Sequence, residues 1–305
     1  MEFHQLRYFL KAAELRNFTQ AAAECFISQP SLSQQIIKLE QELGQPLFER
    51  SARGVELTES GKLLRGRAEQ IVTLVDQARR EITDDGETGQ LAIGAIPTIA
   101  PYFLPEIVRR FREVVPRVTL KVHEDVTEQC LKKVQTGEWD LAIVALPVRI
   151  EHLEVEPLFD EDLWLAVPPG HRLAGTEEVS FEELEHENLL LLGEAHCLTE
   201  HVAQYCRKQD AAPLETGRLA QLTTIQELVS RGQGVSFIPN MCKIADSQRD
   251  SRRDSQKESG TGCVYLPLQG ERPQRTIALV WNSYRYQTQL LKRALEFIRQ
   301  WPSAR

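Results

Sequence analysis

Residues 18–58, FTQAAAECFISQPSLSQQIIKLEQELGQPLFERSARGVELT, decide the fold of the N-terminal part of the chain. Apolar residues recur there at intervals of four, three and four positions, which places them on one face of a helix: Leu32, Ile36, Leu39 and Leu43. Pro30 suits the first turn of that helix, and Gly44 is expected to end it. The stretch therefore predicts an amphipathic helix with Pro30 in its first turn and Gly44 at its end.

The opposite face of this helix carries short hydrogen-bonding groups and one cation, namely Ser31, Gln34, Gln35 and Lys38. A helix that buries one side and presents such groups on the other is typical of a recognition helix in the major groove of DNA. Spacing alone also permits a small helical domain with a solvated polar face. The spacing by itself does not decide between these two interpretations, because such patterns are common.

Two flanking segments extend the pattern. A short helix over Gln20–Cys25 is expected before the recognition helix, with Thr19 as its N-cap. After it, residues 46–58 predict two short strands around an Arg53-Gly54 turn. A wing of this kind places Arg50 and Arg53 at phosphates or in the minor groove.

Five short motifs, FTQAAA (18–23), SQPSLS (28–33), IKLE (37–40), PLFER (46–50) and LTESG (57–61), closely resemble the winged helix-turn-helix of LysR-type transcriptional regulators. That resemblance implies a set of residues at the DNA: Ser28, Gln29, Ser31, Ser33, Gln34, Lys38, Arg50 and Arg53. Helix capping or solvation is the alternative role of Ser28 and Ser33. The partner implied is double-stranded promoter DNA.

A heptad pattern follows the wing, with small or apolar residues at alternating steps of four and three: Leu57, Gly61, Leu64, Ala68, Ile71, Val75, Ala78 and Ile82. The stripe predicts a long helix whose small residues let a second helix approach closely. The alternative is a helix packed on its own domain. The family resemblance implies a linker helix that forms a homodimer, and a homotetramer beyond it. The expected domains are residues 1–58, 59–86 (linker helix and hinge) and 87–305 (regulatory).

Composition sets limits on these expectations. The chain has 305 residues, 42% of them hydrophobic, and a net charge of −8. Residues 1–68 carry nine bases and eight acids, so that the excess of acid lies in the remainder. We expect a cytoplasmic protein, because no apolar run is long enough for a membrane span and the first residues lack a signal-peptide core. The six cysteines form no CxxC pair and no zinc spacing, so neither a metal nor a cofactor is expected.

Residues 87–305 alternate between apolar strands and helices, which predicts a parallel sheet in an α/β fold. The first set of elements is expected at Gln90–Ile96, Pro101–Val114, Val118–His123, Thr127–Thr136 and Trp139–Ala145. A second set is expected at Asn188–Leu192, Leu198–Lys208, Glu215–Leu219, Thr223–Arg231 and Val235–Ile238, with Thr276–Trp281 and Tyr286–Trp301 closing the chain. The pattern resembles the two-lobed, periplasmic-binding-protein-like domain of the same family, whose ligands bind between the lobes. The segment Asp246–Thr261 is wholly polar and predicts a solvated loop.

Cys197 follows the Leu189–Leu192 strand and opens a helix, and Cys206 lies nine residues further on. A helix N-terminus stabilises a thiolate, which peroxide oxidises to a sulfenic acid that a second thiol can trap. If residues 197–206 are one helix, the thiols lie on opposite sides and ~13 Å apart along the axis. A disulfide needs Cα atoms within ~7 Å, so bond formation requires the helix to unravel or to bend sharply. The alternative is a pair of buried structural cysteines.

The His196-Cys197-Leu198 motif and the nine-residue offset are similar to the peroxide-sensing members of the LysR-type family. The resemblance implies that Cys197 is the peroxidatic cysteine and Cys206 the resolving one. It further implies four residues that hold H2O2 and the developing charge: Thr98, Thr127, His196 and Arg275. Helix caps and a surface ion pair are the alternative roles of these side chains. Cys25, Cys130, Cys242 and Cys263 lack this context and are expected to be bystanders.

Three functions compete at this point. The first is a peroxide-responsive transcription factor that is not an enzyme, with H2O2 as effector and with RNA polymerase and a cellular disulfide reductant as further partners. The second is a LysR-type regulator that senses a small metabolite between the lobes. The third is a thiol peroxidase, which is disfavoured because the DNA-reading module would then have no use.

Overall fold

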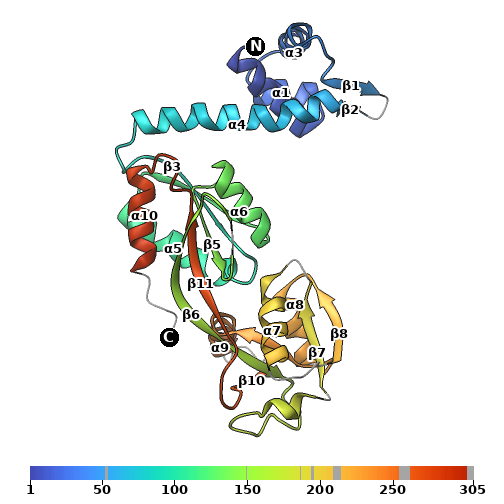
Figure 1. Cartoon of the computed structure of the whole chain (residues 1–305), viewed down its shortest axis with the longest axis vertical. Coiled ribbons are helices and arrows are strands. Elements are labelled where there is room, and N and C mark those ends of the chain that lie inside the picture. Colours follow the sequence, from blue (N-terminus) through green and yellow to red (C-terminus); the bar gives the residue numbers. More distant parts are fainter. Residues whose placement is uncertain are drawn as a thin grey trace. The chain divides into compact units, whose positions relative to one another are not determined.

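Two units, Met1–Thr83 and Asp84–Arg305, make up the chain, and Figure 1 shows their helices and strands. The computed structural model describes residues 1–51, 54–148, 150–185, 187–193, 196–208, 214–253 and 262–300. Within these residues no helix combines the length and the apolar character that a membrane span requires.

The first unit is a winged helix-turn-helix. Its elements are α1 (Phe3–Leu15), α2 (Phe18–Glu24), α3 (Gln29–Leu43), β1 (Phe48–Ser51) and β2 (Gly54–Leu57). The apolar faces of the helices enclose a core in which Phe9, Leu32 and Ile36 are almost inaccessible to solvent. Strands β1 and β2 pair antiparallel, from Phe48 opposite Leu57 to Ser51 opposite Gly54, as expected for the wing.

Helix α3 has Pro30 in its first turn and ends at Gly44, as the sequence predicts. Ser28 is its N-cap and accepts a hydrogen bond from the Ser31 N–H at 3.3 Å. Gly44 ends it with φ of 67°, a left-handed conformation that glycine adopts without strain. The predicted cap of α2 is wrong. Asn17 caps that helix, because its side-chain oxygen reaches the N–H of Thr19 at 2.9 Å, and Thr19 already lies in the first turn.

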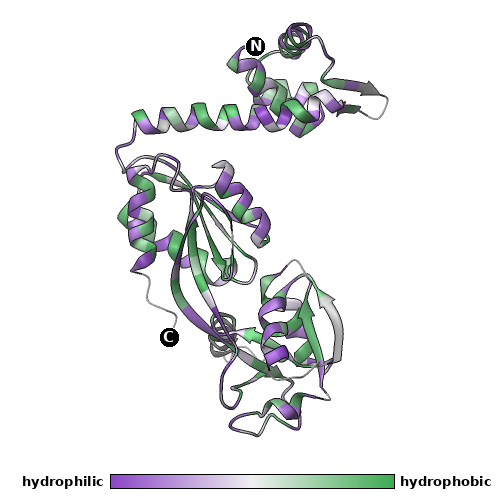
Figure 2. Cartoon of the chain, viewed as in Figure 1, coloured by the Kyte–Doolittle hydropathy of each residue, from purple (hydrophilic) through white to green (hydrophobic). Residues whose placement is uncertain are grey.

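The long helix α4 (Glu59–Ile82) begins at Thr58, whose hydroxyl accepts a hydrogen bond from the Gly61 N–H at 3.0 Å. Its apolar stripe divides into two parts. Gly61 and Ala68 are buried against the core of their own unit, whereas Ile82 is 85% exposed. Hydrophobic and hydrophilic bands alternate along α4 in Figure 2. The sequence expectation of a single seam for a partner helix is therefore wrong for the first half of α4, which packs on its own domain.

Gly61 illustrates this division. A Cβ at this position would lie 2.2 Å from the Leu47 carbonyl oxygen, which belongs to the chain entering the wing. The absence of a side chain at Gly61 therefore lets α4 pack closely against its own wing.

The first lobe of the second unit follows the predicted βαβαβ order. Strand β3 (Gly89–Ala95) pairs in parallel with β4 (Val118–Glu124) and with β5 (Leu141–Ala145). Helices α5 (Ala100–Val114) and α6 (Thr127–Thr136) connect the strands, and α10 (Gln289–Arg299) packs against the same core. Strand β11 (Gln274–Trp281) then joins β5 antiparallel, so the sheet is mixed and not wholly parallel as expected.

Strand β6 (Glu154–Val167) connects the two lobes, and the sequence did not predict it. Its first part pairs antiparallel with β11, and its second part pairs with β9 (Ser236–Pro239) and β10 (Val264–Leu266). In Figure 1 β6 and β11 run side by side from one lobe to the other. Acidic side chains interrupt the apolar alternation of β6, which is why periodicity misses it.

The second lobe contains β7 (Asn188–Leu192) and β8 (Leu214–Leu219), which pair in parallel. A single bridge from Leu189 to Val235 connects β7 to the residues just before β9. Helices α7 (Cys197–Lys208) and α8 (Leu222–Ser230) pack against these strands around a core that is separate from that of the first lobe.

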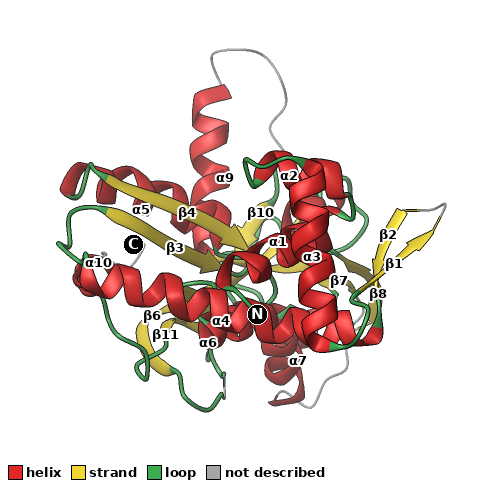
Figure 3. Ribbon diagram, turned by 90° about the horizontal axis from the view of Figure 1, so that it is seen from above, coloured by secondary structure: helices red, strands yellow, loops and turns green. Residues whose placement is uncertain are grey.

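The prediction of a loop over residues 246–261 is wrong in its first part, because helix α9 (Asn240–Arg253) extends into this segment. Residues 246–253 are helical, and residues 254–261 lie outside the described part of the chain. The helix starts in the core, where Met241 and Cys242 are buried. The buried Asp246 carboxylate then accepts a hydrogen bond from the Tyr265 hydroxyl at 2.7 Å, which anchors the start of the polar segment. Figure 3 shows α9 extending away from the strands of its own unit.

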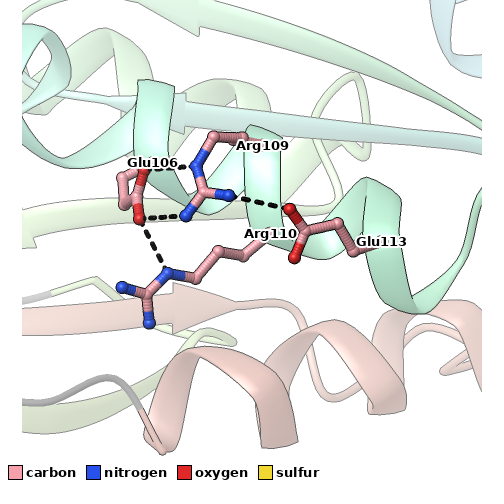
Figure 4. Close-up of polar contacts among 4 residues, drawn as sticks. All are labelled: Glu106, Arg109, Arg110 and Glu113. Carbon is pink, nitrogen blue, oxygen red and sulfur yellow. Dashed lines mark hydrogen bonds and ion pairs between the residues drawn. The ribbon is translucent and has the colours of Figure 1, made fainter.

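The outward face of α5 is charged, and Figure 4 shows its main cluster. Glu106 accepts hydrogen bonds from Arg109 and Arg110, and Arg109 also pairs with Glu113 at 2.7 Å. These two guanidinium groups lower the pKa of Glu106 to about 2. The arginines are therefore neutralised by their own helix, while Phe103 and Ile107 on the other face of α5 enter the core.

Candidate functional site

A small cleft of about 170 Å³, including space open to solvent, lies where three helices of the second unit begin. It is lined by Ile96, Pro97, Thr98, Val126, Thr127, His196 and Cys197. Thr127 is the first residue of α6 and Cys197 the first of α7, and Thr98 lies just before α5. Helix N-termini carry partial positive charge, so the cleft favours an anion or a developing negative charge.

Cys197 is a free, half-buried thiol that packs against the core of the first lobe. Burial raises the pKa of this thiol above its ordinary value. The charge of Arg275 and the nearby Thr127 hydroxyl act in the opposite direction, as do the backbone N–H groups at the start of α7. The sequence expectation that the helix start favours the thiolate is thus correct in direction, but burial outweighs it.

The Thr127 hydroxyl is also notable because its oxygen is buried and makes no hydrogen bond of good geometry with the described residues, although it lies close enough to Cys197 to lower the pKa of that thiol. It lies in the lining of the cleft beside Cys197. A buried hydroxyl without a partner costs free energy unless a ligand or water satisfies it. Thr127 therefore presents its hydroxyl to the cleft beside the Cys197 thiol.

Arg275 reaches the cleft through Thr98. Its Nη1 donates to Thr98 Oγ1 at 2.7 Å and its Nη2 donates to the Thr98 carbonyl oxygen at 3.2 Å. Its Nε donates to Glu161 Oε2 at 2.8 Å, and the two side chains form a fully buried ion pair. The other Glu161 oxygen accepts the Met241 N–H at 2.7 Å, at the start of α9. Arg275 is thus fixed by an ion pair inside the fold, and a surface ion pair is excluded for it.

Cys206 does not belong to this cleft. It lies near the end of α7, is 4% exposed, and packs within the core of the second lobe. Burial raises the pKa of its thiol to about 11. Cys197 and Cys206 are both free thiols on one continuous helix, as the sequence predicts.

His196 precedes Cys197 and lines the same cleft. Burial lowers the pKa of this imidazole, although the charge of Glu124 opposes the effect. The neutral ring is therefore favoured near pH 7, and it can accept or donate a proton at the edge of the cleft.

The remaining cysteines lie elsewhere. Cys130 and Cys242 are buried, and burial raises the pKa of each thiol to about 12. Cys25 lies in the first unit, and Cys263 donates to the Gln226 carbonyl oxygen at 3.3 Å. None of these four thiols lines the cleft.

The predicted DNA-facing residues of α3 differ in the hydrogen bonds that they make within the helix. Gln34 and Lys38 are exposed. Ser28 and Ser31 are also exposed, but their hydroxyls lie within hydrogen-bond distance of each other at 2.7 Å, and Gln29 donates to the Ser33 hydroxyl at 2.8 Å. Arg50 lies in β1, and Arg53 lies outside the described residues. Gln35, which the sequence places on the same polar face, instead accepts a hydrogen bond from Gln5 at 3.2 Å. Gln35 therefore connects α3 to α1.

Glu161 is the residue of this site that the sequence did not single out. It stands in Asp160-Glu161-Asp162, where three consecutive acids suggest a solvated turn. Only the β6 pairing shows that Glu161 faces the interior opposite Arg275. An acid followed directly by the apolar run from Leu163 to Val167 is the one local signal that favours a strand here.

A winged helix-turn-helix joined by a long helix to a two-lobed α/β unit defines a bacterial transcriptional regulator. Residues 3–62 match the family described as bacterial regulatory helix-turn-helix protein, lysR family, and residues 84–303 match the LysR substrate binding domain. The chain belongs to the LysR family of DNA-binding transcriptional regulators. This membership removes the interpretation of the chain as a thiol peroxidase.

The chain is also similar to individual proteins and solved structures that carry a name. The chain is 36% identical over 284 residues to the DNA-binding transcriptional dual regulator OxyR of Escherichia coli K12, with 92% of this chain and 90% of that protein covered. Full-length OxyR of Pseudomonas aeruginosa, in a variant form, superimposes with a TM-score of 0.71 at 31% identity, covering 98% and 96% of the two chains. A cysteine variant of Corynebacterium glutamicum OxyR with H2O2 bound gives a TM-score of 0.60 at 30% identity, covering 98% and 93%.

Proposed function

We propose that this chain is a peroxide-responsive regulator of the OxyR type, in which H2O2 oxidises Cys197 and Cys206 then closes a disulfide with it. The observation that carries the proposal is the placement of Cys197 in a cleft with the buried Thr127 hydroxyl and the Arg275–Thr98 pair. The similarity to proteins named for hydrogen-peroxide induction supports it.

In the first step the Cys197 thiolate attacks one oxygen of H2O2. The S–O bond forms, the O–O bond breaks, and hydroxide leaves and is protonated to water, so that Cys197 becomes a sulfenic acid. The Thr98 and Thr127 hydroxyls orient the peroxide, and the fixed Arg275 charge stabilises the leaving hydroxide. His196 holds or supplies a proton at the edge of the cleft.

In the second step the Cys206 thiolate attacks the Cys197 sulfur. The S–S bond forms, the S–O bond breaks, and a second hydroxide leaves as water after taking up a proton. Nine residues of helix separate the thiols by ~13 Å along the axis, and a disulfide needs Cα atoms within ~7 Å. Closure therefore requires α7 (Cys197–Lys208) to unravel, which couples oxidation to a change of structure.

The remaining parts of the proposal concern partners. Promoter DNA is contacted by α3 and the wing, through the group that contains Gln34 and Lys38. The exposed second half of α4, around Ile82, pairs two chains, and four chains assemble into a tetramer. RNA polymerase is the downstream partner, a cellular dithiol reductant restores the thiols, and the protein acts in the cytoplasm.

Two cysteine variants test this function. Cys197→Ser is expected to abolish the peroxide response while promoter DNA binding persists. Cys206→Ser is expected to leave Cys197 oxidisable to a sulfenic acid that a dimedone probe traps, with no disulfide. If Cys197→Ser still switches promoter binding after stoichiometric H2O2, Cys197 is not the sensor.

A further inference from the structure

His201 lies near the middle of α7 (Cys197–Lys208), between the two cysteines, and contacts the first lobe. Its Nε2 donates a hydrogen bond to the Leu146 carbonyl oxygen, at the end of β5. That acceptor is itself fixed, because the Leu146 N–H donates to the Thr276 carbonyl oxygen of β11 at 2.8 Å. The hydrogen bond from His201 therefore joins the helix to the rigid part of the first lobe.

The side chains of α7 form two groups, one that contacts the first lobe and one that packs in the second lobe. Cys197 and His201 are four residues apart, so they lie on one face, and both contact the first lobe. The second lobe receives a different set, which is buried in its core: Leu198, Val202, Tyr205 and Cys206. The face toward the first lobe thus carries the reactive thiol and, one turn further, an imidazole that is hydrogen-bonded across the lobes.

The second ring nitrogen of His201 bears on the strength of this contact. Because the Leu146 carbonyl only accepts, Nε2 carries the proton and Nδ1 is a bare acceptor. Nδ1 is buried and has no hydrogen-bond partner among the described residues. Nδ1 can hydrogen-bond to water when the helix opens. This gain offsets part of the free energy that is lost with the Nε2 hydrogen bond. The contact therefore holds the closed helix in place by a modest free energy.

We propose that His201 is a positioning residue that restrains α7 in its helical, reduced form and so slows disulfide closure after Cys197 has been oxidised. The inference rests on the two-step function proposed above. His201 does not line the peroxide cleft, so its contribution is to the second step and not to the first. When residues 197–206 unravel to bring the thiols together, the His201–Leu146 hydrogen bond must break.

The test is a step-resolved kinetic comparison of the full-length protein with stoichiometric H2O2. Sulfenic acid formation at Cys197 is followed by dimedone trapping, and disulfide closure is followed by mass spectrometry after alkylation of free thiols. In His201→Leu, closure is expected to accelerate about fivefold, the equivalent of one ordinary hydrogen bond of ~1 kcal/mol. Sulfenic acid formation is expected to stay within about twofold of wild type, because the cleft is untouched.

Two variants control for other causes. His201→Gln keeps an N–H donor of similar reach and is expected to restore the wild-type closure rate. Gln204→Ala removes an exposed side chain of the same helix, whose hydrogen bond goes to Glu200 of that helix, and is expected to leave both steps unchanged. If His201→Leu does not fold, His201→Asn makes the same comparison, because the shorter amide does not reach the carbonyl.

The outcomes separate the two proposals. Unchanged or slower closure in His201→Leu, with normal sulfenic acid formation, overturns the role of His201 and leaves the peroxide function intact. Faster closure in Gln204→Ala as well shows that general loosening of α7 is the cause, and this also overturns it. If wild-type protein forms neither sulfenic acid nor disulfide, the peroxide function itself fails.

Discussion

Cys197 and Cys206 begin and nearly end one continuous helix, yet they pack against different hydrophobic cores, Cys197 against that of the first lobe and Cys206 within that of the second. The helix keeps the two thiols apart in the reduced protein, because they lie on opposite sides of it. A bond between them is incompatible with this packing. The proposed disulfide between Cys197 and Cys206 would therefore change the packing of both lobes.

The buried pair of Glu161 and Arg275 predicts a large loss of stability when one partner is removed. Glu161→Gln leaves the buried guanidinium without its counter-charge, and we expect a loss of about 3–5 kcal/mol in the free energy of unfolding. The control is Glu156→Gln, which weakens the partly exposed pair with Arg299 and is expected to cost less than about 1 kcal/mol. Urea unfolding measures both, and equal losses would contradict the interpretation.

Gln34 and Gln35 are adjacent on α3 but have different surroundings. Gln34 is exposed, so Gln34→Ala is expected to weaken sequence-specific promoter binding by about 1–3 kcal/mol while leaving stability unchanged. Gln35→Ala is expected to lower stability by about 1 kcal/mol through the lost hydrogen bond with Gln5. Fluorescence anisotropy with specific and scrambled duplexes separates the two effects. A Gln34→Ala protein with unaltered specificity would remove this residue from the DNA interface.

Two glycines of α4 make a matched pair. A Cβ at Gly61 would approach the Leu47 carbonyl oxygen to 2.2 Å, whereas a Cβ at Gly66 meets nothing within 4 Å. Gly61→Ala is expected to destabilise the first unit by about 1–3 kcal/mol through overpacking. Gly66→Ala is expected to stabilise it by about 0.5–1 kcal/mol, because alanine is the better helix former. Thermal unfolding of both variants tests this, and stabilisation by Gly61→Ala would show that the wing and α4 separate easily.

Burial of Cys130 gives the stability a predictable pH dependence. Its pKa is raised from 9.0 to about 12 in the folded protein, first by burial and then by the charge of Asp125. The folded state holds this proton more tightly than the unfolded state does, so the contribution is complete below pH 9 and is lost as the pH rises toward 12. The stability advantage of wild type over Cys130→Ala is therefore expected to shrink above pH 9, by up to about 1.4 kcal/mol per pH unit. Urea unfolding at pH 7, 9 and 10 measures it, and a constant difference would contradict the raised pKa.

Much of this architecture follows from local patterns in the sequence. The period of Leu32, Ile36 and Leu39, with Pro30 and Gly44 near the ends, suffices to place α3, because those signals act within a few residues. The placement of Cys197 between a strand and a helix also follows from a pattern of neighbouring residues. The interior role of Glu161 depends on strand pairing with residues more than a hundred positions away, so no local pattern contains it.

Two other features also depend on contacts with distant residues. The polar segment from Asp246 predicts a loop because it has no apolar residue, but α9 extends into it, since the helix starts in the core and Asp246 accepts a hydrogen bond from Tyr265. The heptad of α4 predicts that an apolar surface covers this helix. It does not distinguish a second chain from the domain to which the helix belongs. The close approach of Leu47 to Gly61 assigns the first half of the helix to its own domain.

The most direct test of the redox switch is peptide mapping of the full-length protein after one equivalent of H2O2, combined with hydrogen exchange over α7. We expect one disulfide, joining Cys197 to Cys206, together with loss of amide protection across residues 197–206. Retention of both free thiols after treatment, or a disulfide formed while the amides of α7 stay protected, would contradict the mechanism.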